Sequence, residues 1–291
     1  TNWTSSRKPR LEGRGSLLTT IALRESQRIP YTQEAGISAR TILARTQWVL
    51  GEVDQVEALV HEAVEMARRL GHPFTLAFVL TAASSVYSTL RDAGHALRFA
   101  EEAIVVSMKY SFEGPLAWAI SSQGWALCEM GNEEGLNRLQ KGIAAAHEAK
   151  AGLDDTHTLA LLAEVYLRYQ RVDEGLGVIE EALALVHAQG ETYWHAELLR
   201  LKGELFLAQS DQLIGAAEQC FTEALEIAQA QQATMLQLRA ATSLARFLMK
   251  MNKSDLARRT LSAVRSKFGE QSANPDLRNA QAVLDQLAAA T

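Results

Sequence analysis

Apolar residues in this chain gather in helical runs of about fifteen residues, separated by polar and glycine-containing stretches. A small residue returns near the middle of every second run, at intervals close to 40 positions: Ala44, Ser84, Gly124, Ala163, Gly203 and Ala245. A second series follows it within each pair of runs: Ala63, Ala103, Gly142, Ala182, Ala224 and finally Val264. Because two helices cross closely only where side chains are small, the pattern predicts a stack of helical hairpins.

The turn residues indicate the bounds of six hairpins. Short turns such as GEVDQ at 51–55 separate the two helices of one hairpin, and longer turns such as Gly71-His72-Pro73 separate neighbouring hairpins. First helices are expected near 38–50, 74–90, 115–130, 154–169, 193–208 and 234–250. Second helices are expected near 54–70, 94–110, 134–149, 173–189, 214–230 and 254–267. Asn274-Pro275 then begins a capping helix, whose apolar face contains Leu277, Val283, Leu284 and Leu287.

The composition agrees with an all-α chain. The 291 residues are 47% hydrophobic and 22% charged, with 5 prolines and 7% aromatic residues, and Ala, Leu, Glu and Gln favour helices. No apolar stretch approaches the roughly 20 residues that span a bilayer, and the first residues lack the apolar centre of a signal peptide. A cytoplasmic protein without membrane contact is therefore expected. Cys128 and Cys220 lie in different repeats and indicate neither a disulfide nor a zinc site.

Several repeats resemble the tetratricopeptide repeat. Gly124, Leu127, Gly131, Gly135 and Gly142 follow its order of a small residue, a large apolar residue, a turn glycine and two small residues in the second helix. The resemblance implies an all-α, right-handed superhelical solenoid of about six hairpins with a C-terminal capping helix. The period near 40 residues exceeds the usual length of about 34, so a HEAT-like helical solenoid is the competing interpretation.

Residues 31–288 also resemble the C-terminal repeat region of large bacterial regulators that couple a cyclase or DNA-binding module to an ATPase module. LLAEVYLRYQRVDEGL, YWHAELLRLKGELFL and LRAATSLARFLMK carry this resemblance. It implies a regulatory interaction surface in signalling. The expected organisation is a basic N-terminal segment that is poorly structured or partly helical (1–30), a repeat domain (31–270), and a capping helix with a tail (271–291).

Catalytic and metal-binding motifs are absent from the sequence. The phosphate-binding Gly-x-x-x-x-Gly-Lys-Ser/Thr does not occur, and Ser122-Gln123-Gly124 lacks the first glycine of a nucleophile elbow. His61 and Glu65 share one helix face, but such a pair on an acidic surface is more often solvated than bound to a metal. We therefore expect no catalysis, no metal and no cofactor. A hydrolase-like enzyme with a non-standard site in the groove is the alternative.

The position of a residue relative to the mid-helix small residue indicates whether it faces the inside of the solenoid. In a tetratricopeptide stack the first helices line the concave wall, which gives these predicted binding residues: Arg45, Trp48, Phe78, Trp118, Trp125, Glu129, His157, Glu164, Arg168, Glu197, Arg200, Glu204, Arg239, Arg246 and Lys250. The tryptophans either form an aromatic floor for a peptide or pack between helices. The alternating Glu and Arg either bind that peptide or pair with each other.

Charge is distributed unevenly behind the net value of −5. Residues 31–238 contain 14 basic and 28 acidic residues, whereas residues 239–267 contain eight basic and one acidic. The basic last repeat is suited to an acidic partner or to self-association through the acidic middle of another copy. Nucleic-acid binding by this repeat is an alternative, but the chain contains no recognised base-reading module. The sequence favours a non-catalytic scaffold that binds a protein, a peptide or another domain of its parent protein.

Overall fold

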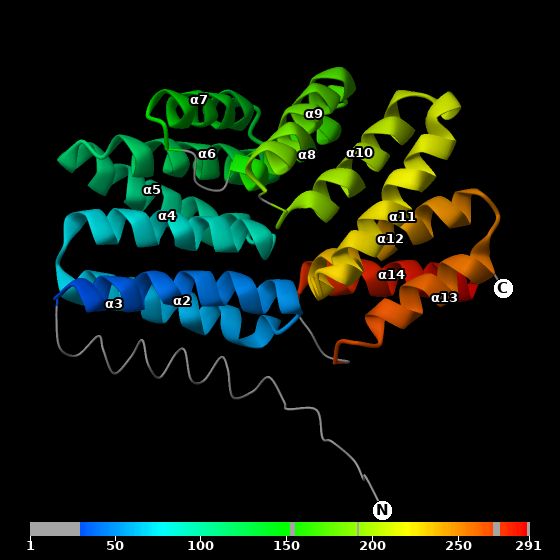
Figure 1. Ribbon diagram of the computed structural model, residues 1–291, viewed down its shortest axis with the longest axis horizontal. Helices are drawn as coiled ribbons and strands as arrows, with labels where there is room; N and C mark the ends of the chain where they lie inside the picture. The colour runs from blue at the N-terminus through cyan, green and yellow to red at the C-terminus, as the bar shows by residue number, and fades with distance from the viewer. Residues whose placement is uncertain (1–29, 152–154, 191, 270–273, 290–291) are drawn as a thin grey trace, which may run out of the picture.

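The protein is built from helical hairpins, and the computed structural model describes residues 30–151, 155–190, 192–269 and 274–289. The first helices of the hairpins are α2 (Pro30–Leu50), α4 (Pro73–Thr89), α6 (Glu113–Glu129), α8 (Asp155–Arg168), α10 (His195–Gln209) and α12 (Thr234–Lys250). The second helices are α3 (Val56–Leu70), α5 (Ala93–Tyr110), α7 (Glu134–Glu148), α9 (Val172–Gln189), α11 (Ile214–Ala230) and α13 (Ser254–Arg265). Single 3-10 turns, η1 (Val53–Gln55) and η2 (Asp211–Leu213), precede α3 and α11. The last described helix is α14 (Pro275–Ala289), as Figure 1 shows.

The helix bounds agree with the sequence pattern to within a few residues, except at the start of α2. That helix begins at Pro30, whereas the pattern placed its start near residue 38. Proline suits the first turn of a helix because its backbone N–H is not needed there, and no further proline interrupts the residues that follow. The predicted basic segment 1–30 lies outside the described residues apart from Pro30, so the proposed division of the chain stays a prediction.

Small residues set how closely the two helices of a hairpin approach. A Cβ atom placed on Gly124 of α6 would come within 2.2 Å of the backbone nitrogen of Leu139 on α7. On the other side of the same crossing, a Cβ on Gly142 would come within 2.4 Å of the backbone nitrogen of Ser121. Both neighbours are backbone atoms, which cannot rotate away as a side chain can. The repeating small residues therefore permit the close crossings, as the sequence pattern predicted.

The helix α14 caps the last hairpin. Leu277, Ala280, Val283 and Leu287 are buried, and α14 packs on both α12 and α13. Leu284, which was expected on the same face, is only partly buried. Asn274 begins the helix by accepting a hydrogen bond from the backbone N–H of Asp276 at 2.8 Å. The capping helix thus covers apolar surface that the sixth hairpin would otherwise expose. None of the described helices is both long and apolar enough to cross a membrane.

The array of hairpins curves until its first and last members meet. The helix α2 of the first hairpin contacts α12 of the sixth hairpin, although four hairpins lie between them in the chain. Figure 1 shows the first hairpin beside the C-terminal helices. At the end of α2, a Cβ on Gly51 would come within 2.8 Å of the Phe268 ring. The first helices surround the interior of this curve, and their facing surfaces are called the inner face below. Both ends of the array thus contribute to it.

The glycine crossings give a test with a matched control. Gly124→Ala places a methyl group against backbone and should lower the free energy of unfolding by about 2–4 kcal/mol. Gly177→Ala, in the exposed middle of α9 with no atom within 4 Å of the new methyl, should instead raise it by about 0.5–1 kcal/mol. Urea denaturation followed by circular dichroism measures both. Equal effects of the two substitutions would contradict the assigned crossing.

Candidate binding site on the inner face

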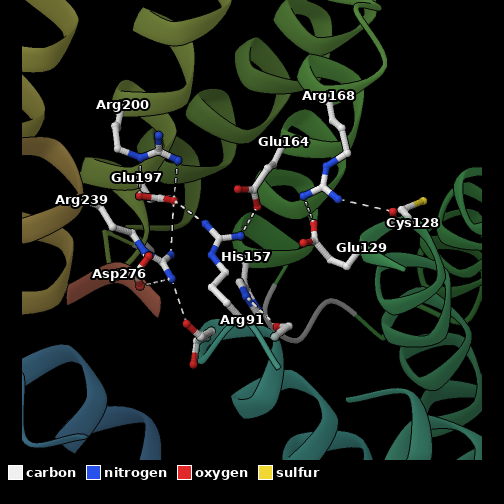
Figure 2. A network of polar contacts seen from close by, with 12 residues as sticks. Arg91, Cys128, Glu129, His157, Glu164, Arg168, Glu197, Arg200, Arg239 and Asp276 are labelled. Atoms are coloured by element: carbon white, nitrogen blue, oxygen red, sulfur yellow. Dashed lines mark hydrogen bonds and ion pairs between the residues drawn. The ribbon is translucent and has the colours of Figure 1, made fainter. Parts of the chain in front are cut away.

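A buried carboxylate lies at the centre of the inner face. Glu197, on α10, is only 3% exposed and accepts two hydrogen bonds of 2.9 Å from Arg200, one turn further along the same helix. The guanidinium of Arg239, on α12, lies 3.4 Å from the same carboxylate, and that of Arg91 lies at 3.8 Å. Arg91 also pairs with Glu164 of α8 (Figure 2). Three arginines from different parts of the chain therefore share one carboxylate.

Arg239, in the last repeat, contacts both the capping helix and the first two hairpins. It donates a hydrogen bond to Asp276 of α14 at 2.9 Å and another to the backbone carbonyl of Thr89, at the end of α4, at 2.8 Å. A second guanidinium nitrogen lies 2.8 Å from the same Asp276 oxygen, which completes the ion pair. Its guanidinium also lies 4.8 Å from the centre of the Trp48 ring, a cation–π contact with α2. Because one side chain contacts four helices, it holds the first, second and last hairpins and the cap together.

Aromatic rings continue this network toward the N-terminal half. Trp194, in the turn before α10, stacks on His157 of α8 with ring centres 4.3 Å apart, and its ring centre lies 5.8 Å from that of Trp48. The neighbouring Tyr193 donates a hydrogen bond of 3.3 Å to the backbone carbonyl of Arg45. The fifth repeat thereby touches the first directly. We call the contacts of Trp48, Arg91, Trp194, Glu197 and Arg239 the central network.

Arginines dominate the electrostatics of the central network. Burial by itself raises the pKa of Glu197, but the charges of Arg200, Arg239 and Arg91 outweigh it, so that this pKa lies well below its usual range. The pKa of Glu164 is likewise lowered: burial acts against ionisation, and Arg91 more than compensates. Both carboxylates therefore stay charged at neutral pH, and each is paired within the protein.

An apolar cavity of about 470 Å³ lies on one side of the central network. Its walls include Phe78 and Trp118, whose rings meet edge to face with centres 6.3 Å apart, together with Leu161 and Tyr193. Eight serine and threonine side chains also line it, from α2, α4, α6 and α8. We call it the apolar cavity. Its volume falls in the range of about 300–1,000 Å³ that ligand pockets occupy.

A second cavity, of about 360 Å³, lies on the other side of the network and is charged. Its lining contains five arginines and three carboxylates, and two further carboxylates, Glu197 and Glu204, lie against Arg200. Four of the five arginines pair with these carboxylates, as Figure 2 shows for Arg168 with Glu129, and the exposed Arg246 donates to the side-chain oxygen of Asn279. Because its charges are compensated internally, this cavity does not offer a strong field for either an anion or a cation.

The two cavities contain most of the binding residues that the sequence predicted. The apolar cavity is lined by Arg45, Phe78, Trp118 and His157. The charged cavity is lined by Glu129, Glu164, Arg168, Arg200, Arg239 and Arg246. Glu197 lies in the small gap between the two cavities, where His157, Glu164 and Arg239 also contribute. The structure therefore does not form one continuous groove from these residues but separates them into two sites.

The other predicted residues are not part of the lining of either cavity. Trp48 and Trp125 are fully buried, which corresponds to the packing interpretation of the tryptophans, whereas Trp118 lines the apolar cavity. Glu204 accepts a hydrogen bond of 2.6 Å from Ser243, and Lys250 is exposed beside the end of α12. Most of the alternating charges pair with one another rather than standing open to a partner.

Three important residues of this region were not found by the repeat pattern. Arg91 lies in the turn after α4 with a left-handed backbone (φ 61°), a position that glycine often occupies. Tyr193 lies in the turn before α10, and Asp276 lies in the capping helix. Arg91 and Asp276 are outside the first helices, to which the predicted inward positions were restricted, and Tyr193 is not at an inward position of the helix expected over 193–208. The left-handed backbone of Arg91 is a feature of the structure that the sequence did not indicate.

The described residues contain no group of three or more His, Cys, Asp or Glu side chains that could hold a metal ion. His61, one of the pair noted in the sequence, lies 3.2 Å from the Tyr87 hydroxyl, and Glu65 pairs with Arg68. Both cysteines are buried, and burial raises the pKa of each thiol. Several basic residues of the last repeat also have internal partners: Arg258 donates to the Leu287 carbonyl and Lys253 pairs with Glu218.

Comparison with solved structures identifies the architecture. The chain is similar to a signal transduction ATPase with numerous domains from Pyrococcus horikoshii that has a tetratricopeptide repeat sensor, with a TM-score of 0.51 and 16% identity over 94% of this chain. It is also similar to yeast Tom70, with a TM-score of 0.52 and 11% identity over 95% of this chain. The chain is a tetratricopeptide-like helical solenoid. The predicted all-α repeat architecture is confirmed.

The likeness concerns the fold, because the identities are low. This solenoid covers 43% of the Pyrococcus protein and 59% of Tom70, so each of those chains contains parts without a counterpart here. No family model matches the sequence, and no curated protein matches it. The helical hairpins have a longer period than the usual repeat of about 34 residues, and the solenoid nevertheless keeps the packing of neighbouring helix pairs.

The lowered pKa of Glu197 gives a pH-dependent test. Its ionised form stabilises the folded protein above the unfolded pKa of about 4.3, and this contribution is lost as the pH falls through the folded pKa. Glu197→Gln should lower the free energy of unfolding by about 3–5 kcal/mol at neutral pH, because it leaves buried arginines without their partner. The variant should also lose less stability than the wild type between about pH 5 and pH 3. Urea denaturation across this range measures both effects, with the exposed Glu101→Gln as the control. Parallel pH profiles of wild type and Glu197→Gln would contradict the assigned role.

Proposed function

We propose that this solenoid is a non-catalytic interaction module of a larger regulatory protein, and that it anchors a short segment of a partner protein in the apolar cavity. The proposal places the module in bacterial signalling, as the resemblance of its repeats to bacterial regulators implies, and in the cytoplasm, as expected from its sequence. The Pyrococcus protein, whose tetratricopeptide repeats are described as a sensor, supports a regulatory role. The partner is a protein segment or another domain of the parent protein.

The shape and lining of the apolar cavity carry this proposal. It is the larger of the two main hollows among the described residues, and it combines aromatic walls with hydroxyl groups. Such a combination suits a buried anchoring side chain, which is the kind of contact that supplies most of the binding energy at protein interfaces. The charged cavity lacks this property, because its arginines and carboxylates already satisfy one another.

The central network limits how a bound segment can lie. His157, Leu161 and Ser88 line both the apolar cavity and the small gap beside Glu197, so the network forms the floor of the apolar cavity on that side. An extended peptide along the whole inner face would have to displace the Arg239 contacts with Asp276 and Thr89. We therefore propose a short segment that inserts one anchoring side chain rather than a strand that follows all six repeats.

Filling the apolar cavity tests this function. Peptides are first selected from a displayed random library on the wild-type protein, and their affinities are measured by calorimetry. Ala82→Trp, which places a large ring at the wall of the apolar cavity, should weaken binding at least about tenfold, or 1.4 kcal/mol. Val105→Trp, at a 67% exposed position of the outer helix α5, should leave the affinity unchanged. Circular dichroism and thermal melting verify that both variants fold.

Three results would overturn the proposal. The first is the selection of peptides that bind the Ala82→Trp variant as tightly as the wild type, since these peptides would not use the apolar cavity. The second is a stronger loss of binding in the Val105→Trp variant, which would place the interaction on the outer helices. The third is failure to select any peptide on the folded wild-type protein, because a module that recognises short segments should yield one.

A further inference from the structure

Five of the eight hydroxyl groups that line the apolar cavity donate their hydrogens to backbone carbonyls of their own helices. Thr41 donates to the Ser38 carbonyl at 2.8 Å, Thr81 to the Ala77 carbonyl at 2.9 Å, and Thr46 to the Ile42 carbonyl at 2.9 Å. Ser88 and Ser121 donate in the same way to the Ser85 and Ala117 carbonyls. A backbone carbonyl can only accept, so the hydroxyl must be the donor in each pair. The Ser121 oxygen lies against Gly142 in the helix crossing, whereas the Thr41 and Thr81 oxygens keep lone pairs that can accept from a bound group.

Other donors in the cavity wall are also engaged by the protein itself. The indole N–H of Trp118 donates to the Ala151 carbonyl at 2.8 Å, and the Tyr193 hydroxyl donates to the Arg45 carbonyl at 3.3 Å. His157 lies between Ser88, 3.4 Å from its Nε2, and Ser85, 3.3 Å from its Nδ1. Because the Ser88 hydrogen is used, the Ser88 oxygen can only accept from Nε2 of His157. Apart from the guanidinium of Arg45, which has an interaction of its own within the protein, the groups named above leave mainly hydrogen-bond acceptors toward the cavity.

The remaining lining restricts the charge and the shape of an occupant. Phe78 and Trp118 meet edge to face and, with Tyr193 and Leu161, form walls suited to a flat ring. Among the described residues, no aspartate or glutamate lines the cavity, whereas Arg45 adds a positive charge. A cationic side chain would find no carboxylate among the described lining residues to pair with it. A carboxylate occupant would meet the hydroxyl lone pairs and would lose its water shell in an apolar site.

We infer that the apolar cavity is built for an uncharged aromatic side chain that carries a hydrogen-bond donor, the indole of tryptophan or the phenol of tyrosine on the partner segment. This inference rests on the proposed function and specifies the chemistry of its anchor. The ring packs against Phe78 and Trp118, and its N–H or O–H donates to a wall hydroxyl such as that of Thr41 or Thr81. An aromatic ring without a donor leaves these acceptors unpaired once water is excluded.

Pairs of small probes that differ only in the donor test this chemistry on the full chain. N-acetyl-tryptophanamide is compared with its 1-methylindole counterpart, and N-acetyl-tyrosinamide with N-acetyl-phenylalaninamide. Binding is followed by chemical-shift titration of the protein. The probe with the N–H or O–H group should bind about five- to tenfold more tightly than its partner without it, because only that probe satisfies the wall acceptors.

A double variant separates hydrogen bonding from shape. Thr41→Val with Thr81→Val removes two acceptors and leaves the walls apolar, so the two members of each probe pair should bind with nearly equal affinity. The folding of this variant should be little affected, because both hydroxyls donate mainly to carbonyls within their own helices, apart from a longer contact of 3.4 Å between Thr81 and the Pro115 carbonyl. Thr222→Val is the matched control, since Thr222 donates to the Glu218 carbonyl in the same way but lies exposed on α11. It should preserve the preference for the donor.

The outcomes distinguish this inference from the proposed function. Equal binding of the paired probes to the wild type, an unchanged preference in the double variant, or binding of none of the four probes up to their solubility limits would overturn the inference. Tighter binding of N-acetyl-lysinamide than of the aromatic probes would also overturn it, in favour of a cationic anchor. If selected peptides still lose affinity in the Ala82→Trp variant, the proposed function stands although the anchor has a different chemistry.

Discussion

The compensation of one buried negative charge governs the arrangement of the inner face. Glu197 is almost fully removed from water, and a carboxylate in such surroundings is unstable unless cations and donors surround it. Arg200 is available on the same helix, but Arg91 and Arg239 must come from the second and sixth hairpins. The charge can therefore be satisfied only if the array curves enough to bring these hairpins to α10. The separation of the inner face into two cavities follows from the same contacts.

The central network contributes more to geometry than to net stability. Burying paired charges gains attraction but costs the hydration of every group, and the two contributions nearly cancel. What the network excludes is any packing that leaves Arg239, Asp276 or Glu197 without its partner, because an uncompensated buried charge costs several kcal/mol. Apolar burial in the hairpins supplies the bulk of the stabilisation, through residues such as Val60, Phe99 and Leu139, which are at most 2% exposed.

The hairpins could be predicted from the sequence because their determinants are local. A small residue at each crossing and a polar turn after each helix are visible within one repeat, and Gly124 and Gly142 lie where the pattern placed them. The wall of the apolar cavity was predicted in part, since Phe78 and Trp118 follow from the register of the repeats. For Trp48 the sequence left open whether the ring packs between helices or faces a partner, because the rings and the guanidinium that cover it belong to residues nearly 150 or more positions away. Arg91 and Tyr193 were missed because their partners, Glu164 and Glu197 for Arg91 and Arg45 for Tyr193, are also distant in the chain.

The contacts that close the array give it an unusual order of assembly for a repeat protein. Solenoids are built from local contacts, so their hairpins can form early and independently along the chain. Tyr193 and Arg45 are 148 residues apart, and Arg239 and Thr89 are 150 apart. These pairs meet only after the hairpins between them have stacked, because the intervening repeats determine the curvature. The apolar cavity, which Tyr193 helps to complete, is therefore among the last features of the protein to form. A chain that stops short of the fifth repeat would have well-formed helices and an incomplete cavity.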